Sequence, residues 1–104
     1  LGRGMVFNKF TGARGKSGSS DASAEYLGQL RRMMDENNVS YQLAELGRVD
    51  LGGGGTIAYI MARYGMDVID NGVAVMSMHA PWEVTSKADI CEMKKGYDVF
   101  LRNA

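Results

Sequence analysis

The sequence predicts an α/β fold in which helices pack on a layered sheet. Short apolar runs typical of strands alternate along the chain with segments in which apolar residues recur at helical spacing. This alternation is typical of helices that cover a sheet. A length of 104 residues, of which 45% are apolar, allows one small domain or one part of a larger domain.

The first half of the chain carries two predicted strands and one helix. Residues 5–10 have strand character, and a loop rich in glycine, serine and basic residues follows. Ser20 or Asp21 is expected to cap a helix that ends at residues 37–38. Residues 40–46 form the second expected strand. The apolar face of the helix consists of Tyr26, Leu27, Leu30, Met33 and Met34.

Two further strands surround a strong turn signal. Residues 66–69 are apolar and predict a short strand, and residues 70–72 (Asp-Asn-Gly) predict a turn. Residues 73–78 are small or apolar throughout, as expected for a strand covered on both faces. This strand places His79 at its carboxyl end, where α/β sheets gather ligand sites.

Helical spacing predicts two more helices. The first follows the glycine tract and ends at Gly65, which is expected to adopt a left-handed cap conformation. The second is capped by Ser86, with Asp89 in the capping-box position. The expected buried side chains are Ile57, Ile60, Met61 and Tyr64 in the first helix and Ile90, Met93, Tyr97, Phe100 and Leu101 in the second.

Charge and cysteine content exclude several classes of protein. Twelve basic and twelve acidic residues leave no net charge for binding nucleic acid or anionic lipid. No apolar run approaches the roughly 20 residues that span a bilayer. Cys91 is the single cysteine, which fits a reducing, cytoplasmic compartment, and we interpret it as a packing residue rather than a nucleophile.

Two glycine-containing motifs are candidates for anion binding. The run Gly15-Lys16-Ser17 resembles part of a P-loop but has Phe10 where that motif needs glycine, which favours a flexible basic loop. Residues 52–55 are four consecutive glycines before a predicted helix. The amides of Gly54, Gly55 and Thr56 could therefore face an anion or a carbonyl oxygen, or the segment could only reverse the chain direction.

His79 is the single histidine, and two interpretations remain open for it. A neutral imidazole at the end of a strand can hold a metal ion, but it can equally be a structural, hydrogen-bonded side chain. Glu83 could orient the imidazole as an acceptor, or could be a solvated charge of the loop.

Three blocks of the sequence resemble the aspartyl/vacuolar aminopeptidases, a family of di-zinc metallopeptidases. The blocks occur in the family's order and span nearly all of the chain. They are Lys9-Phe10-Thr11-Gly12 with the downstream Ser19–Glu25, the run Arg48–Ile57 (RVDLGGGGTI), and the run Asp70–Val84 (DNGVAVMSMHAPWEV).

The resemblance implies the carboxyl-terminal portion, residues 1–104, of a catalytic domain with a zinc-peptidase α/β sandwich. It implies that His79 is the family's last zinc ligand. It also implies that Lys9 contributes to the pocket for the first substrate side chain, and that Gly54, Gly55 and Thr56 line the peptide cleft. The other metal ligands and the general base are expected before Leu1.

The whole enzyme is then expected to bind two zinc ions, to remove amino-terminal, often acidic, residues from peptides, and to form a homo-oligomer. The isolated chain is expected to be inactive. Two other hypotheses are a non-catalytic module that binds an anion through its basic arm and glycine loop, and a fragment whose exposed sheet edge and apolar faces favour association.

Overall fold

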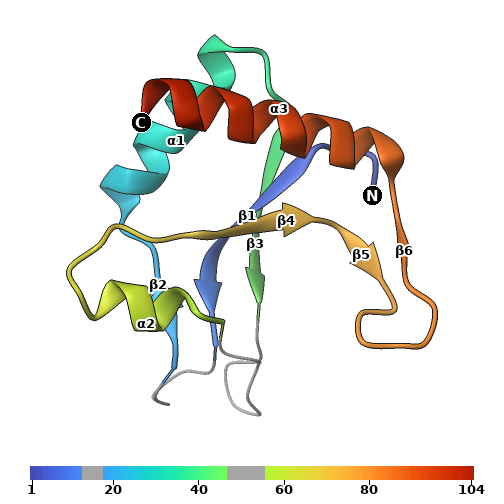
Figure 1. Cartoon of the computed structure of the whole chain (residues 1–104), viewed down its shortest axis with the longest axis horizontal. Helices are drawn as coiled ribbons and strands as arrows, with labels where there is room; N and C mark the ends of the chain where they lie inside the picture. The colour runs from blue at the N-terminus through green and yellow to red at the C-terminus, as the bar shows by residue number, and fades with distance from the viewer. Residues whose placement is uncertain (13–17, 47–55) are drawn as a thin grey trace. The chain divides into compact units, whose positions relative to one another are not determined.

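The computed structural model describes residues 1–12, 18–46 and 56–104, and its mixture of strands and helices confirms the predicted α/β class (Figure 1). The elements in chain order are β1 (Met5–Thr11), β2 (Ser20–Asp21), α1 (Ala24–Glu36), β3 (Tyr41–Leu46), α2 (Ala58–Ala62), β4 (Asp70–Val73), β5 (Val75–Met76), β6 (Val84–Thr85) and α3 (Lys87–Asn103). No helix in these residues is long and apolar enough to cross a membrane.

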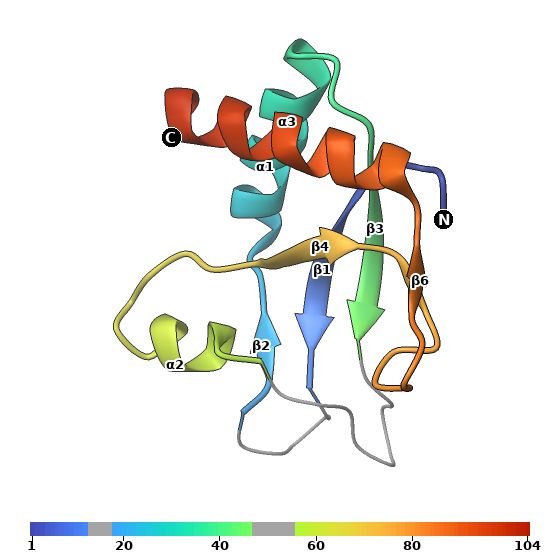
Figure 2. The ribbon, with the colours of Figure 1, turned by 45° about the vertical axis from the view of Figure 1, so that its right-hand side comes forward.

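Strand β1 is the centre of the larger sheet. The strand order of this sheet is β2-β1-β3 (Figure 2). Strand β4 also pairs with β1. The β1–β2 pair is antiparallel and places Phe10 opposite Asp21 and Thr11 opposite Ser20. Strands β5 and β6 form a separate two-stranded hairpin.

The chain divides into two compact units whose boundaries pass through β1, α1, β3 and β4. The first unit consists of Leu1–Val6, Leu30–Gln42 and Asn71–Ala104. The second unit consists of Phe7–Gln29 and Leu43–Asp70. The candidate residues are divided between them, because His79 belongs to the first unit and both Lys9 and Thr56 belong to the second.

The core of the first unit lies beneath helix α3. Gly96 of α3 is buried, and a Cβ atom at this position would collide with the side chain of Met5 and lie 3.5 Å from Val39. Close approach of this kind requires a residue without a side chain. The helix is therefore held against apolar side chains of β1 and of the α1–β3 connection. The buried apolar residues of this unit are Met5, Val6, Leu30, Met34 and Val39.

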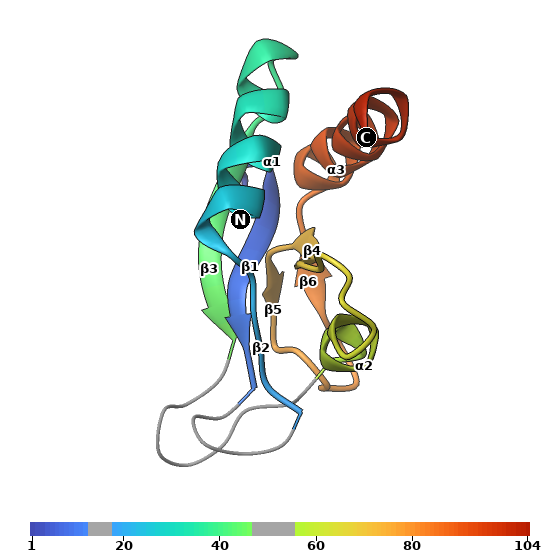
Figure 3. The same cartoon turned by 90° about the vertical axis from the view of Figure 1, so that its left-hand side faces the viewer.

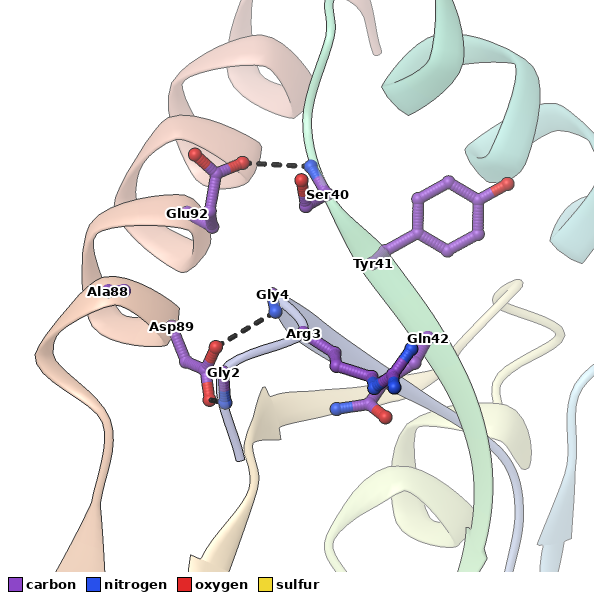
Figure 4. Close-up of a pocket in the computed structure, with 9 residues that line it drawn as sticks. All are labelled: Gly2, Arg3, Gly4, Ser40, Tyr41, Gln42, Ala88, Asp89 and Glu92. Atoms are coloured by element: carbon purple, nitrogen blue, oxygen red, sulfur yellow. Dashed lines mark hydrogen bonds between the residues drawn. The ribbon is translucent and has the colours of Figure 1, made fainter.

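The amino end of α3 binds the amino-terminal segment through a buried carboxylate. Asp89 is 1% exposed, and its two oxygens accept hydrogen bonds from the backbone N–H of Gly2 at 2.7 Å and of Gly4 at 2.8 Å (Figure 4). The Ser86 hydroxyl caps the helix as predicted by accepting from the Asp89 N–H. Glu92, one turn further along, accepts from the Ser40 N–H at 2.8 Å. Both carboxylates therefore tie α3 to chain segments outside the helix.

Replacing Asp89 with asparagine is expected to lower the melting temperature by a few degrees at pH 7 and by less at pH 2. The N–H groups of Gly2 and then Gly4 hold the pKa of Asp89 below its ordinary value. The resulting stabilisation is complete above about pH 4 and is lost as the pH falls through the lowered pKa of the folded state. Thermal unfolding of both proteins at the two pH values measures this loss.

Asp98→Asn, on the exposed side of the same helix, is the matched control, and it should change the melting temperature little. An Asp89→Asn effect of equal size at both pH values would contradict the charge-based explanation.

In the second unit, the first helix starts later than the sequence predicts. Ser20 and Asp21 do not cap it, because they form β2 and pair with β1. The cap is Ser23, whose hydroxyl accepts from the Tyr26 N–H at 3.2 Å. The predicted strands at 5–10 and 40–46 and the body of the helix are confirmed. Among the residues of this unit that the structure describes, the buried apolar ones are Phe7, Ala22, Leu27 and Ala58.

The region between β3 and α3 differs most from the prediction. Residues 66–69 are not a strand, and the expected turn at 70–72 belongs to β4. The expected buried strand at 73–78 is reduced to the end of β4 and the two-residue β5. Gly65 has the predicted left-handed conformation, with φ of 77°. Helix α2 buries Ala58. The side chains predicted to face the core are instead exposed, so this prediction is wrong; they are Ile57, Ile60, Met61 and Tyr64.

The predicted buried stripe of α3 is also wrong in part. Ile90, Tyr97 and Leu101 are exposed, and Met93 and Phe100 are half-buried. The side of the helix that faces the rest of its unit instead carries Asp89 and Gly96. The reason is that amide groups and a bulky methionine lie beneath the helix, and these accommodate a carboxylate and a glycine better than large apolar side chains.

Candidate functional site

His79 lies in the turn that joins β5 to β6. The turn is at the end of the hairpin away from α3, which follows β6 in the chain (Figure 3). His79 is exposed and lies beyond the end of β5, so the prediction that it ends a buried strand is wrong. Its imidazole is therefore accessible from solvent in this hairpin.

The backbone of this turn is strained and is held by two hydrogen bonds. Ser77 and His79 have φ angles of 59° and 68°, in the left-handed region that non-glycine residues rarely adopt. The His79 N–H donates to Glu83 Oε1 at 2.5 Å, and the Ala80 N–H donates to the Ser77 carbonyl at 3.0 Å. Glu83 therefore fixes the backbone of His79, and it does not orient the imidazole as one of the two interpretations expected. Strain of this kind is often kept at functional sites.

The described residues do not form a complete metal site by themselves. Within residues 1–12, 18–46 and 56–104, no group of three His, Cys, Asp or Glu side chains comes together to hold an ion. A zinc site in a peptidase requires at least three protein ligands. His79 can thus supply one imidazole nitrogen, and a zinc ion would need further ligands from outside these residues.

In the second unit, Thr56 is part of a hydrogen-bonded group with Thr11 and Asp70. The Thr56 hydroxyl donates to Asp70 Oδ2 at 2.7 Å, and the Thr11 hydroxyl donates to the same oxygen at 3.0 Å. The two hydroxyl oxygens lie 3.4 Å apart. Thr11 is 1% exposed, so this group is anchored at the buried end of β1. These hydrogen bonds hold the side chain of Thr56, the residue that directly follows the glycine tract.

Lys9 forms an ion pair with Asp21 across the β1–β2 pair. The Lys9 carbonyl also accepts from the Ala22 N–H at 2.9 Å, which holds the two chain segments together. The side chains of Lys9 and Asp21 are 33% and 62% exposed, so the pair faces solvent. An anion that approaches Lys9 would consequently compete with the carboxylate of Asp21.

The remaining predicted site residues, Gly54 and Gly55, lie outside the described residues, as does Lys16. The anion-binding hypothesis depends largely on those positions. Sequence reasoning missed Asp21 and Asp70. The sequence predicts that Asp21 caps a helix and that Asp70 begins a turn, and neither prediction contains the contacts with Lys9 and Thr56.

Comparison with known proteins gives consistent matches along the whole chain. The family model of the aminopeptidase I zinc metalloproteases (M18) matches residues 1–101. A probable M18 family aminopeptidase 1 of Clostridium acetobutylicum is 64% identical over 103 residues, and its Thermotoga maritima counterpart is 50% identical over 97 residues. These stretches cover 99% and 93% of this chain, and 22% of each relative.

Solved structures agree with this result. The crystal structure of aminopeptidase I from Clostridium acetobutylicum matches with a TM-score of 0.89 and 64% identity over 99% of this chain and 23% of that one. The M18 family aminopeptidase from Thermotoga maritima matches with a TM-score of 0.88 and 48% identity over 97% of this chain and 22% of that one. The fold thus matches that of the corresponding part of both enzymes.

Proposed function

The chain belongs to the M18 family of aminopeptidase I zinc metalloproteases, and from this membership we propose that it is the carboxyl-terminal portion of the catalytic domain of an aminopeptidase. The chain spans about a fifth of the length of the relatives it matches, 22% in the first case. The proposed activity, removal of amino-terminal residues from peptides, therefore belongs to a longer protein that contains these residues.

The observation that carries this proposal is the exposed His79 in its strained turn. We propose that His79 binds one of two zinc ions, with the other ligands and the general base supplied from outside the described residues. When bound, zinc polarises the scissile carbonyl and lowers the pKa of a bound water. The hydrogen bond from the His79 N–H to Glu83 fixes the backbone from which the imidazole extends. Preorganisation of a ligand in this way reduces the entropy that is lost on metal binding.

For the peptide substrate, we propose contacts with Lys9, Gly54, Gly55 and Thr56. The pairing of Lys9 with Asp21 bears on the choice of substrate. An acidic first residue must displace the Asp21 carboxylate to reach Lys9, whereas a neutral one leaves the ion pair in place. We therefore expect a weak preference for acidic residues. A cytoplasmic, homo-oligomeric whole protein is part of the same proposal, supported by the lone cysteine and by exposed apolar side chains such as Trp82 and Leu101.

A chimaeric enzyme tests the proposed function. This chain replaces the matching 103-residue segment of the Clostridium acetobutylicum relative, with which it is 64% identical. The chimaera is expected to release amino-terminal residues from short peptides at a rate within about tenfold of the unaltered relative, because core substitutions that preserve volume are well tolerated. A zinc chelator should abolish the activity. A panel of peptides that differ only in an acidic or neutral first residue measures the substrate preference.

The isolated chain is the negative control for this experiment. It is expected to show no hydrolysis, because its described residues supply one histidine and no group of three ligands. If the isolated chain hydrolyses peptides and a chelator stops this activity, the proposal that the other zinc ligands lie outside the described residues is contradicted. A folded but inactive chimaera, beside an active relative, would contradict the proposed function.

A further inference from the structure

We propose that Asp70 is a positioning residue for peptide binding, which it serves by holding the hydroxyl of Thr56. This inference rests on the proposed function, because it assigns a role within the same peptide cleft. Asp70 lies at the start of β4, and Thr56 is the residue that follows the glycine tract. The two residues are 14 positions apart in the sequence and are joined by a hydrogen bond of 2.7 Å.

The geometry shows that the Thr56 hydroxyl is already used within the protein. It donates its proton to Asp70 Oδ2, and its oxygen accepts from the Ala58 N–H at 3.3 Å. A hydroxyl has one proton to donate, so this proton is not available to a substrate. Any hydrogen bond that Thr56 donates to a peptide would then come from its backbone N–H, which lies in the residue whose hydroxyl the Asp70 carboxylate holds. A hydrogen bond to an ionised carboxylate is about twice as strong as one between neutral groups, which suits this role.

Among the described residues, the amino end of helix α2 lacks a side-chain cap from its own N-cap residue. The helix contains five residues, of which Ala58 is buried, and its N-cap residue is Ile57. Thr56 supplies that missing acceptor through its hydroxyl. The hydroxyl is in turn held by Asp70, to which the buried Thr11 of β1 also donates. The carboxylate therefore links the first turn of α2 to the central strand of the sheet.

Variants of the active chimaera test the inference through the separation of KM from kcat. Thr56→Val preserves the shape of the side chain but removes the hydroxyl, and Asp70→Asn removes the charge. Each is expected to raise KM about tenfold, equivalent to roughly 1.4 kcal/mol of binding, with kcat changed less than about twofold. Thr56→Ser retains the hydroxyl and is expected to keep KM within about twofold of the parent. The KM of the double variant should equal that of either single variant, because both substitutions disturb the same hydrogen bond.

Zinc content and melting temperature accompany the kinetics. A rise in KM with rescue by Thr56→Ser and unchanged zinc content supports the positioning role. Unchanged KM in Thr56→Val and Asp70→Asn overturns it. A fall in kcat together with a lowered melting temperature, without the selective rise in KM, also overturns it, because that pattern indicates a purely structural contact. If the chimaera is inactive before any substitution, the proposed function fails first and this inference fails with it.

Discussion

Replacing His79 with asparagine in the chimaeric enzyme is expected to abolish peptide hydrolysis. Loss of a metal ligand removes several kcal/mol of charge stabilisation in the transition state, which corresponds to a fall in kcat/KM of about a thousandfold or more. Bound zinc is expected to fall by about one equivalent per chain, because a site that loses one of its few protein ligands binds the ion weakly. Peptide assays and metal analysis on the same preparation measure both quantities.

Asparagine is the appropriate replacement because of the backbone at this position. His79 has a φ of 68°, and asparagine adopts the left-handed region more readily than alanine does. His79→Asn thus removes the imidazole while keeping the turn and its hydrogen bond to Glu83. With His79→Ala, by contrast, distortion of the turn could itself account for lost activity.

Glu83→Gln is the matched control in the same turn. A glutamine keeps an oxygen that accepts from the His79 N–H but removes the carboxylate charge. Since Glu83 bonds to the backbone of His79, its charge is expected to matter little, and the control should retain activity within about threefold. If His79→Asn keeps its zinc and its activity, His79 is not a ligand. If Glu83→Gln loses as much zinc as His79→Asn, the carboxylate itself belongs to the metal site.

The sequence predicts some elements of the fold better than others. Elements that depend on local sequence patterns are predicted well, and elements that depend on contacts between distant residues are not. Helix α1 follows from a local pattern, because Leu27, Leu30 and Met34 are buried at helical spacing. Strand β1 follows from its apolar run, of which Met5, Val6 and Phe7 are all buried. Strand β3 also lies where the sequence predicts it, although its Leu43 is exposed. Strand β4 could not be predicted in this way. Its Asp-Asn-Gly sequence favours a turn locally, but Asp70 is held by two threonine hydroxyls that lie 59 and 14 residues away in the sequence. Tertiary contacts override local preference in this region.

In the candidate site, too, the sequence predicts features set by local motifs but not contacts between distant residues. The residue type and the motif around it make His79 a candidate ligand, but the acceptor for its N–H depends on a turn geometry that spacing alone does not contain. The Lys9–Asp21 pair depends on the register of β1 and β2, which places Phe10 opposite Asp21. Because residues 11–20 were expected to be a loop, no register could be assigned to them. Polar contacts between distant segments were therefore the part of the site that the sequence did not predict.

Gly4→Ala is expected to cause the largest loss of stability among glycine substitutions in the amino-terminal segment. Gly4 has a φ of 90°, which costs an alanine roughly 1–2 kcal/mol. An added Cβ would also overlap the Ser40 carbonyl and lie 2.8 Å from Ser40 Cβ. That carbonyl accepts the Met5 N–H at 3.0 Å, so it cannot withdraw without breaking a hydrogen bond of the buried strand. With about 1–3 kcal/mol for overpacking, the expected loss in the free energy of unfolding is about 3 kcal/mol.

Two other glycines separate the causes of this loss when urea unfolding is measured for all three variants. Gly2 has a φ of 79° but open space where an added methyl group would lie, so Gly2→Ala should cost only the roughly 1 kcal/mol of backbone strain. Gly28 lies within α1, with nothing within 4 Å of an added Cβ, so Gly28→Ala should stabilise the protein by about 0.5–1 kcal/mol. Equal losses for Gly2→Ala and Gly4→Ala would contradict the close approach of Gly4 to Ser40. Since the alanine at position 4 keeps the N–H that Asp89 accepts, a larger loss for Gly4→Ala must come from that approach and not from the carboxylate.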